Sequence, residues 1–108
     1  MRAQHDTLDT IFDALANPSR REIVTRLVHG PMTTPEVGHH FGFSKQALSR
    51  HVSVLAGAGL IDRVTRGRVQ ELTVVPERLE LVSHWVAAVR RGWESNLDRL
   101  DQVLRGNR

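Results

Sequence analysis

The spacing of apolar positions divides the first part of the chain into short amphipathic helices. Apolar residues recur every three or four positions in residues 6–16, which is typical of a helix with one buried face. Asn17 and Pro18 follow, and they suit a helix start because Asn caps a helix and Pro fits its first turn. We therefore expect a second helix over residues 18–28, with Ile23, Leu27 and Val28 facing inward.

The next stretch reads as a short helix, a tight turn and a capped helix. Residues 34–41 fit the short helix, and Gly42 supplies the turn because glycine tolerates positive φ at little cost. Ser44 is a good N-cap for a helix that ends near Gly57. The expected inner side of this helix is Ala47, Leu48, Val52 and Leu55, and the expected polar side is Lys45, Gln46, Ser49 and Arg50. Together these segments predict a helix-turn-helix.

Two β-rich stretches follow the helix-turn-helix. Residues 60–65 and 69–74 are rich in β-branched and apolar residues, and residues 66–68 (Arg-Gly-Arg) lie between them as a turn. A polar helix followed by a basic hairpin is the layout of a winged helix-turn-helix, which suits a helix in the major groove and a wing against the DNA backbone. The expected fold is therefore mainly α with a small β-hairpin wing, in the order four helices, two strands and one long helix.

The last helix is expected to begin at Pro76 and to run to about Leu104. It carries a regular apolar stripe and would span roughly 40 Å. A domain of this size cannot cover such a stripe alone, so we expect a two-fold dimer. The alternative is a break at Gly92 that folds the helix back over its own core. The stripe consists of Leu79, Val82, Val86, Val89, Trp93, Leu97, Leu100 and Leu104.

A chain of 108 residues is expected to form one domain, residues 1–108. Within it we expect residues 6–16 and 77–104 to form the dimer interface, with Trp85 beside the stripe. The chain has no signal peptide and no apolar run that could span a bilayer, so we expect a cytoplasmic protein. It has no cysteine, which excludes disulfides, thiolate metal sites and a cysteine nucleophile. The predicted interface residues are Leu8, Ile11, Phe12, Leu79, Val82, Trp85, Val86, Val89, Trp93, Leu97 and Leu100.

The positive charge is concentrated near the predicted helix-turn-helix and wing. The formal net charge is only +3, and Lys45 is the only lysine beside fourteen arginines. Residues 20–75 hold eight basic and four acidic residues, a balance of +4, whereas residues 1–19 sum to −2 and residues 76–108 to +1. This distribution favours a nucleic-acid partner for the middle of the chain.

Several stretches give the chain a resemblance to a known family. Residues 13–23 (DALANPSRREI), residues 44–52 (SKQALSRHV) and residues 63–68 (RVTRGR) resemble the second helix, the recognition helix and the wing of the ArsR (SmtB/ArsR-like) family. The resemblance extends over residues 8–90 and is weaker in the helical tail. It implies a homodimeric bacterial or archaeal transcription factor associated with the nucleoid, usually a repressor that leaves its operator when a signal arrives.

Many members of the ArsR family sense metals, but the residues that this resemblance aligns with their ligands cannot bind a metal. Thr33 and Pro35 stand at the thiolate pair of the third helix. The last-helix site would fall near Val74, Pro76, Ala87 and Arg90, none of which is a ligand for Zn²⁺. The chain therefore resembles the metal-independent branch, and we expect neither a metal nor another cofactor. The effector, if one exists, is unknown.

Residues on the predicted recognition helix divide into two roles in DNA binding. Gln46, Ser49 and Arg50 are expected to read bases, because Arg pairs with guanine and Gln with adenine in bidentate fashion. Ser44 and Lys45 lie at the helix start and are better placed for phosphates. The alternative is a solvated polar face with no ligand. His51 completes the predicted DNA-binding set on this helix.

The predicted wing contributes a second group of DNA contacts. Arg66 and Arg68 are expected to flank the minor groove or its phosphates, and Gly67 allows the tight tip. Arg63 either contacts a phosphate or pairs with Asp62 or Glu71 on neighbouring positions.

The predicted function is sequence-specific DNA binding by a homodimeric repressor at a palindromic operator of double-stranded DNA. The alternative is a winged-helix module that binds another protein through the long last helix. No arrangement typical of an enzyme is present, neither a catalytic triad nor a phosphate-binding glycine loop, so we do not expect catalytic activity.

Overall fold

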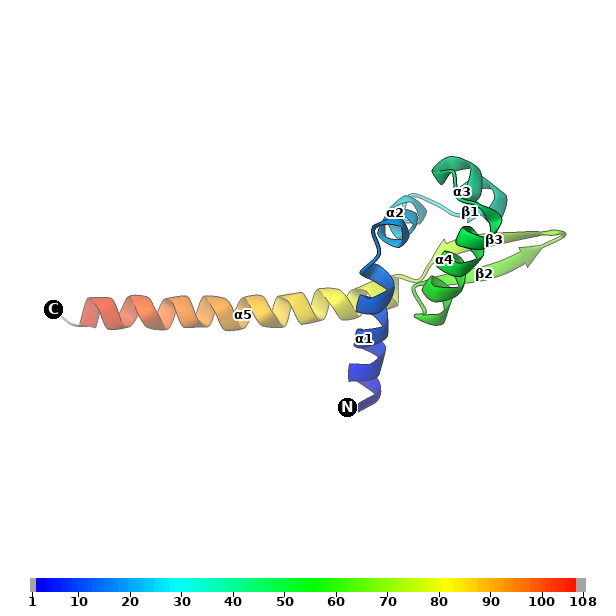
Figure 1. Cartoon of the computed structure of the whole chain (residues 1–108). Helices are drawn as coiled ribbons and strands as arrows, with labels where there is room; N and C mark the ends of the chain where they lie inside the picture. Colours follow the sequence, from blue (N-terminus) through cyan, green and yellow to red (C-terminus); the bar gives the residue numbers. More distant parts are fainter. Residues whose placement is uncertain (1, 107–108) are drawn as a thin grey trace.

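The computed structural model describes the backbone of residues 2–106 and the side chains of residues 7–106. The ends of the predicted domain, residue 1 and residues 107–108, lie outside the described residues. The predicted mainly α fold with a wing and a long last helix is confirmed (Figure 1). The element order is α1 (Arg2–Leu15), α2 (Pro18–Leu27), β1 (Met32–Thr33), α3 (Thr34–Phe41), α4 (Lys45–Gly57), β2 (Ile61–Arg66), β3 (Val69–Val74) and α5 (Pro76–Gly106).

One strand was not predicted from the sequence. The two residues of β1 pair antiparallel with β3, Met32 opposite Leu72 and Thr33 opposite Glu71, so the wing belongs to a three-stranded sheet in the order β1-β3-β2. This pairing ties the segment before α3 to the base of the wing. The element order therefore contains one strand, between α2 and α3, that we did not expect.

The turn between α1 and α2 is held by side chains of α2. Arg20 Nε donates a hydrogen bond of 2.6 Å to the carbonyl of Ala14, and Arg21 Nη1 donates one of 2.6 Å to the carbonyl of Leu15. The Asn17 side chain caps α2 by accepting from the main-chain N–H of Arg20 at 3.1 Å, as predicted. These bonds satisfy carbonyls that the end of α1 would otherwise leave open.

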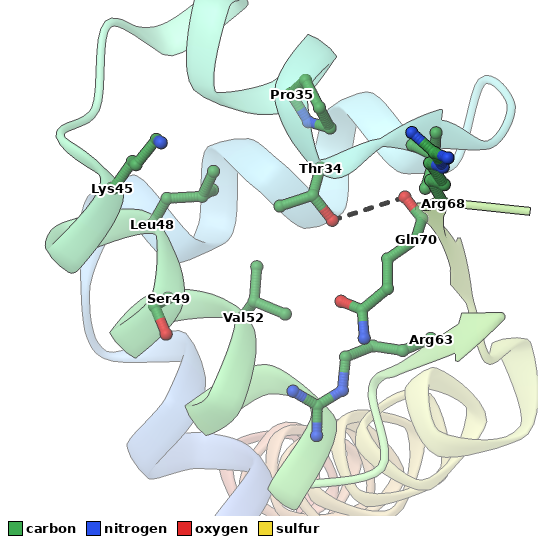
Figure 2. A pocket seen from close by; sticks show the side chains of 10 residues that line it. Thr34, Pro35, Lys45, Leu48, Ser49, Val52, Arg63, Arg68 and Gln70 are labelled. Atoms are coloured by element: carbon green, nitrogen blue, oxygen red, sulfur yellow. Dashed lines mark hydrogen bonds between the residues drawn. The ribbon is translucent and has the colours of Figure 1, made fainter. Parts of the chain in front are cut away.

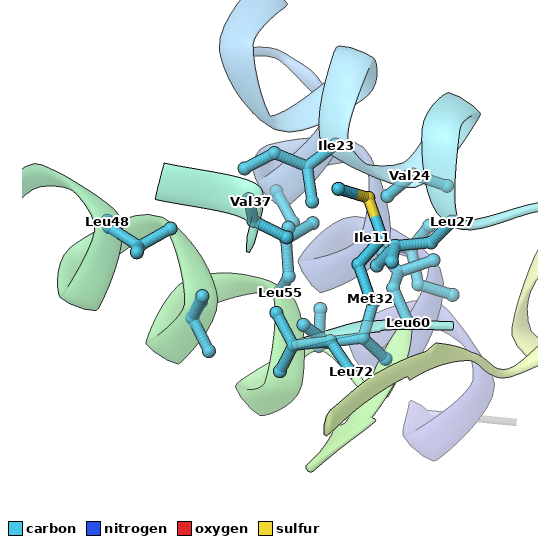
Figure 3. Close-up of a cluster of buried hydrophobic side chains, with 14 residues drawn as sticks. Ile11, Ile23, Val24, Leu27, Met32, Val37, Leu48, Leu55, Leu60 and Leu72 are labelled. Carbon is cyan, nitrogen blue, oxygen red and sulfur yellow. The ribbon is translucent and has the colours of Figure 1, made fainter. Parts of the chain in front are cut away.

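The core lies between α1, α2, α3, α4 and the sheet (Figure 3). Two sequence expectations about it are wrong. Ile11, predicted at the dimer interface, is fully buried inside its own protomer. Val28 is 57% exposed, because α2 ends at Leu27 and leaves Val28 at its C-cap. The largest fully buried side chains are Ile11, Ile23, Leu27, Val37, Leu55, Leu60, Ile61 and Leu72.

Helix α5 projects away from the rest of the molecule as one unbroken helix (Figure 1). It continues through Gly92, so the alternative of two shorter helices is wrong. The radius of gyration is 19.2 Å, whereas a compact chain of this length has about 13 Å. Trp93 is 63% exposed and Leu104 is 65% exposed, and no residue of α5 is fully buried. In the part of the chain that the structure describes, no helix is long and apolar enough to cross a membrane.

Candidate nucleic-acid interface

The helix-turn-helix is built by two capped helices and a glycine turn. Thr33 and Glu36 form a reciprocal capping box at α3, in which the Thr33 N–H donates to Glu36 Oε1 at 2.8 Å and the Glu36 N–H donates to Thr33 Oγ1 at 3.3 Å. Hydrogen bonding by the main chain and then by the side chain of Thr33 lowers the pKa of Glu36 below its ordinary value, because it stabilises the carboxylate. Gly42 then adopts φ of 71°, the left-handed turn expected from the sequence. Ser44 Oγ caps α4 by accepting from the N–H of Ala47 at 3.1 Å.

The polar side of α4 lies in solvent, as predicted. Its members, which we name the recognition face, are the exposed residues Lys45, Gln46, Ser49 and Arg50. Leu48, Val52 and Leu55 are buried on the opposite side and fix the rotation of the helix. The N-terminal residues of α4 therefore present two cationic and two uncharged polar side chains beside a helix N-terminus, which is a favourable place for phosphate groups.

His51 differs from the other predicted DNA contacts. Its ring lies 5.1 Å from the ring of Phe43 and is half-buried, and Nδ1 is buried without a hydrogen-bond partner. Burial, and then the positive charges of Arg20 and Arg50, lower the pKa of His51. Its ring therefore takes part in the packing between the turn and α4, and its contact with DNA stays a prediction.

The wing is a regular antiparallel hairpin whose tip differs slightly from the expected turn. Arg66 pairs with Val69 as the last rung, so only Gly67 and Arg68 form the turn, and Gly67 has φ of 65°. Arg66 Nε lies 3.2 Å from Glu71 Oε1. Of the three alternatives for Arg63, which are a phosphate, Asp62 and Glu71, pairing with Glu71 therefore loses its support, because Glu71 pairs with Arg66.

Predicted DNA contacts from both elements meet around one surface cavity of about 440 Å³ (Figure 2). Lys45 and Ser49 reach it from α4, and Arg63 and Arg68 reach it from the wing. We name this cavity, between α3, α4 and the wing, the groove. The sequence alone does not show that side chains of α4 and of the wing line the same cavity, and only the structure brings them together.

Thr34 and Gln70 are among the groove residues that the sequence did not indicate. The Thr34 hydroxyl, at the start of α3, donates a hydrogen bond of 3.4 Å to the main-chain carbonyl of Gln70 in β3 (Figure 2). Both residues line the groove. Alternation along residues 69–74 was the available signal for Gln70, whereas nothing in the sequence connects Thr34 with the wing.

The described residues offer no cluster of metal ligands. Within residues 7–106, no three or more His, Asp or Glu side chains lie close enough together to hold a metal ion. His40 packs edge-on against Phe41, with ring centroids 4.6 Å apart.

The residues predicted to form a dimer interface lie along α1 and α5. Phe12 of α1 packs edge-on against Trp85 of α5, with ring centroids 5.5 Å apart. Leu8 is half-buried, and Leu79 and Val82 pack partly against the protomer core. The remaining members are exposed, namely Val86, Val89, Trp93, Leu97 and Leu100.

Comparison with known proteins relates this chain to bacterial regulators. A family described as a helix-turn-helix domain matches residues 15–64. The chain is similar to the transcriptional repressor SdpR of Bacillus subtilis, with 33% identity over 61 residues that cover 56% of this chain and 68% of SdpR. It is also similar to the HTH-type transcriptional regulator Rv2034 of Mycobacterium tuberculosis, with 42% identity over 53 residues that cover 49% of this chain. That match spans only 50% of the mycobacterial protein.

A solved structure extends this similarity beyond the helix-turn-helix. The crystal structure of an ArsR family transcriptional regulator superposes with a TM-score of 0.78 and 33% identity, over 83% of this chain and 93% of that chain. The similarity therefore includes the wing and much of the helical framework as well as α3 and α4. The chain belongs to the ArsR family of winged helix-turn-helix regulators and is a DNA-binding regulator of transcription.

Proposed function

We propose that this protein is a homodimeric repressor that binds a palindromic operator in bacterial or archaeal cytoplasm. The observation that supports this proposal best is the groove, around which Lys45 and Ser49 of α4 approach Arg63 and Arg68 of the wing. A helix and a hairpin arranged in this way suit the major groove and the neighbouring backbone of one DNA half-site. Repression is the activity named for the similar protein SdpR.

Each residue of the recognition face has a role in this proposal. Gln46, Ser49 and Arg50 read base edges, each bidentate contact contributing about 1–3 kcal/mol of discrimination. Lys45 and the N-terminal N–H groups of α4, oriented by the Ser44 cap, bind phosphates. Phosphate contacts fix the register of the helix, and base contacts give it specificity.

The wing supplies contacts that depend little on sequence. Arg68 at the tip and Arg63 at the groove bind the backbone or enter the minor groove, while Gly67 keeps the tip narrow. Arg66 must exchange its contact with Glu71 for a phosphate, so we expect it to contribute less than Arg68.

Dimerisation in this proposal uses residues 6–16 and 77–104 of a single domain. The exposed part of the stripe on α5, together with Phe12, Trp85 and the half-buried Leu8, Leu79 and Val82, would pack against the same surface of a second copy. The core residue Ile11 takes no part. Two recognition helices related by a two-fold axis would enter successive major grooves about 34 Å apart.

A DNA titration tests the first part of the proposal. The protein is titrated against the DNA upstream of its own gene and against the same DNA scrambled, at two salt concentrations. We expect tighter binding to the native sequence, with an affinity that falls as salt rises because phosphate contacts release counterions. Equal binding to both sequences that disappears at the higher salt would overturn sequence-specific regulation at this site and favour a protein partner for α5.

A charge placed on the stripe tests the dimer. Val89 is 50% exposed, so Val89→Asp should leave the protomer folded but place a carboxylate inside the proposed interface. Light scattering should then give the protomer mass of 12.2 kDa in place of twice that mass. Ser95→Asp adds the same charge on the opposite side of α5 and should remain dimeric. A monomeric wild-type protein would contradict the proposal directly.

A further inference from the structure

The groove between α3, α4 and the wing has a feature that DNA binding leaves unused. Its wall is mainly apolar, formed by side chains that include Leu48 and Val52 of α4 and Val69 of β3. Its volume of about 440 Å³ falls within the roughly 300–1,000 Å³ that is usual for small-molecule sites. We propose that the groove binds a small amphipathic anion, an apolar chain or ring that carries a carboxylate, and that this ligand and DNA exclude one another.

The charge around the groove favours an anion. Lys45, Arg63 and Arg68 contribute three cationic groups, and none of the residues that line it is acidic. Among the described residues, neither Arg63 nor Arg68 has a carboxylate within ion-pair distance, whereas the nearby Arg66 is paired with Glu71. An anion at the rim would therefore meet guanidinium groups that need not first release another partner.

The apolar wall distinguishes this ligand from the DNA backbone. A phosphate group and its sugar gain little free energy from contact with valine and leucine side chains, because only apolar groups are stabilised when such contact removes them from water. Val69 is 38% exposed, so its side chain has apolar surface left to bury. A ligand with an apolar tail gains from this wall while its carboxylate reaches Arg63 or Arg68 at the rim.

The anion and DNA would exclude one another because both would use the same cationic residues. The regulatory part of the inference rests on the proposed function, in which Lys45, Arg63 and Arg68 bind the DNA backbone. A bound anion would occupy the same cations and repel the phosphates. It would also lie beside the Thr34–Gln70 hydrogen bond, which joins α3 to the wing at the edge of the groove.

Nuclear magnetic resonance with octanoate as the probe tests the site without DNA. We expect saturable shifts of the main-chain signals of Leu48, Val52 and Val69. Octanol has the same chain length without the charge, and it should bind at least about tenfold more weakly. An absence of saturable octanoate shifts at the groove, or shifts confined to the apolar stripe of α5, would overturn the site.

Two variants of equal charge separate the site from general electrostatics. Arg63→Gln removes a cation at the groove and should weaken octanoate binding by about tenfold, because a charge-assisted hydrogen bond is lost. Arg90→Gln removes a cation from the exposed surface of α5, far from the groove, and should leave octanoate binding unchanged. Equal losses in both variants would show attraction to net charge alone and would overturn the site.

A competition experiment then tests exclusion. Saturating octanoate should weaken binding of the wild-type protein to its upstream DNA by at least about tenfold, and octanol at the same concentration should not. Octanoate shifts at the groove with unchanged DNA affinity would overturn exclusion and leave the site. If the protein without octanoate does not distinguish native from scrambled DNA, the proposed function fails, and the octanoate shifts still decide whether the site exists.

Discussion

The hydroxyl of Thr34 donates a hydrogen bond of 3.4 Å to the main-chain carbonyl of Gln70, and this bond joins α3 to the wing. The pairing of β1 with β3 lies directly beside it. The wing is therefore attached to the helix-turn-helix through the segment before α3 as well as through the turn after α4. Its direction relative to the recognition face depends on these contacts.

Removing this hydroxyl should affect DNA binding more than folding. The bond is long and exposed, so Thr34→Val should lower the free energy of unfolding by only about 0.5 kcal/mol. The affinity for DNA should fall further than this, because the wing loses one of its attachments. Urea denaturation and a DNA titration measure the two effects, and Thr34→Ser, which keeps the hydroxyl, is the control. A stability loss as large as the loss in DNA binding would contradict a specific role in wing position.

The cap of α4 allows stability and DNA binding to be separated at one position. Ser44→Ala removes the acceptor for the Ala47 N–H and should destabilise the fold by about 1 kcal/mol. Ser44→Asp keeps a capping oxygen, so its thermal stability should remain close to that of the wild type. The added carboxylate would face phosphates, and we expect DNA affinity to fall at low salt and to recover partly relative to wild type as salt rises. Unchanged DNA affinity in Ser44→Asp would place the start of α4 away from the DNA backbone.

Arg50 and Arg68 should differ in the kind of DNA binding that they support. Arg50→Ala should cost about 1–3 kcal/mol on the preferred site and relax the base preference there. Arg68→Ala should weaken all sequences similarly and reduce the slope of affinity against salt by about one phosphate contact. Titrations with a set of single-base variants of the operator measure both. An unaltered base preference in Arg50→Ala would contradict the assigned recognition face.

His51 should make the fold less stable in mild acid. Burial lowers its folded pKa below the ordinary value of 6.5. Between the lowered folded pKa and the ordinary value, the unfolded chain binds a proton that the folded chain does not. The free energy of unfolding therefore falls as pH falls through this window. Above pH 6.5 the contribution is fully present. Denaturation of wild type and His51→Gln between pH 7 and pH 5 measures the difference, and the variant should lose less stability on acidification. Parallel pH profiles would contradict a depressed pKa.

The parts of the fold that depend on local sequence could be predicted well. Ser44, Gly42 and the apolar spacing behind the recognition face located α3 and α4, because capping and periodicity act within one or two turns. Gly67 located the wing tip for the same reason. Strand β1 could not be found in this way, because two residues become a strand only through pairing with residues some forty positions later.

The errors in the predicted site have a similar cause. Ile11 and Phe12 are both apolar and adjacent, and only the packing of α1 decides that Ile11 enters the core while Phe12 reaches Trp85. The packing of His51 could not be predicted either, because only the fold shows that the turn after α3 places Phe43 against its ring. The groove likewise depends on the distance between α4 and the wing, and this distance cannot be derived from the spacing of residues along the chain.

Lys45 is exposed in the first turn of α4 and is the only lysine in the chain. Acylating dyes and other amine reagents therefore have a single side-chain target, and it lies on the recognition face. A fluorophore attached at this position would report from the surface that we propose to meet DNA, without the introduction of a cysteine. The same chemistry makes acetylation of one residue sufficient to remove a positive charge from the recognition helix.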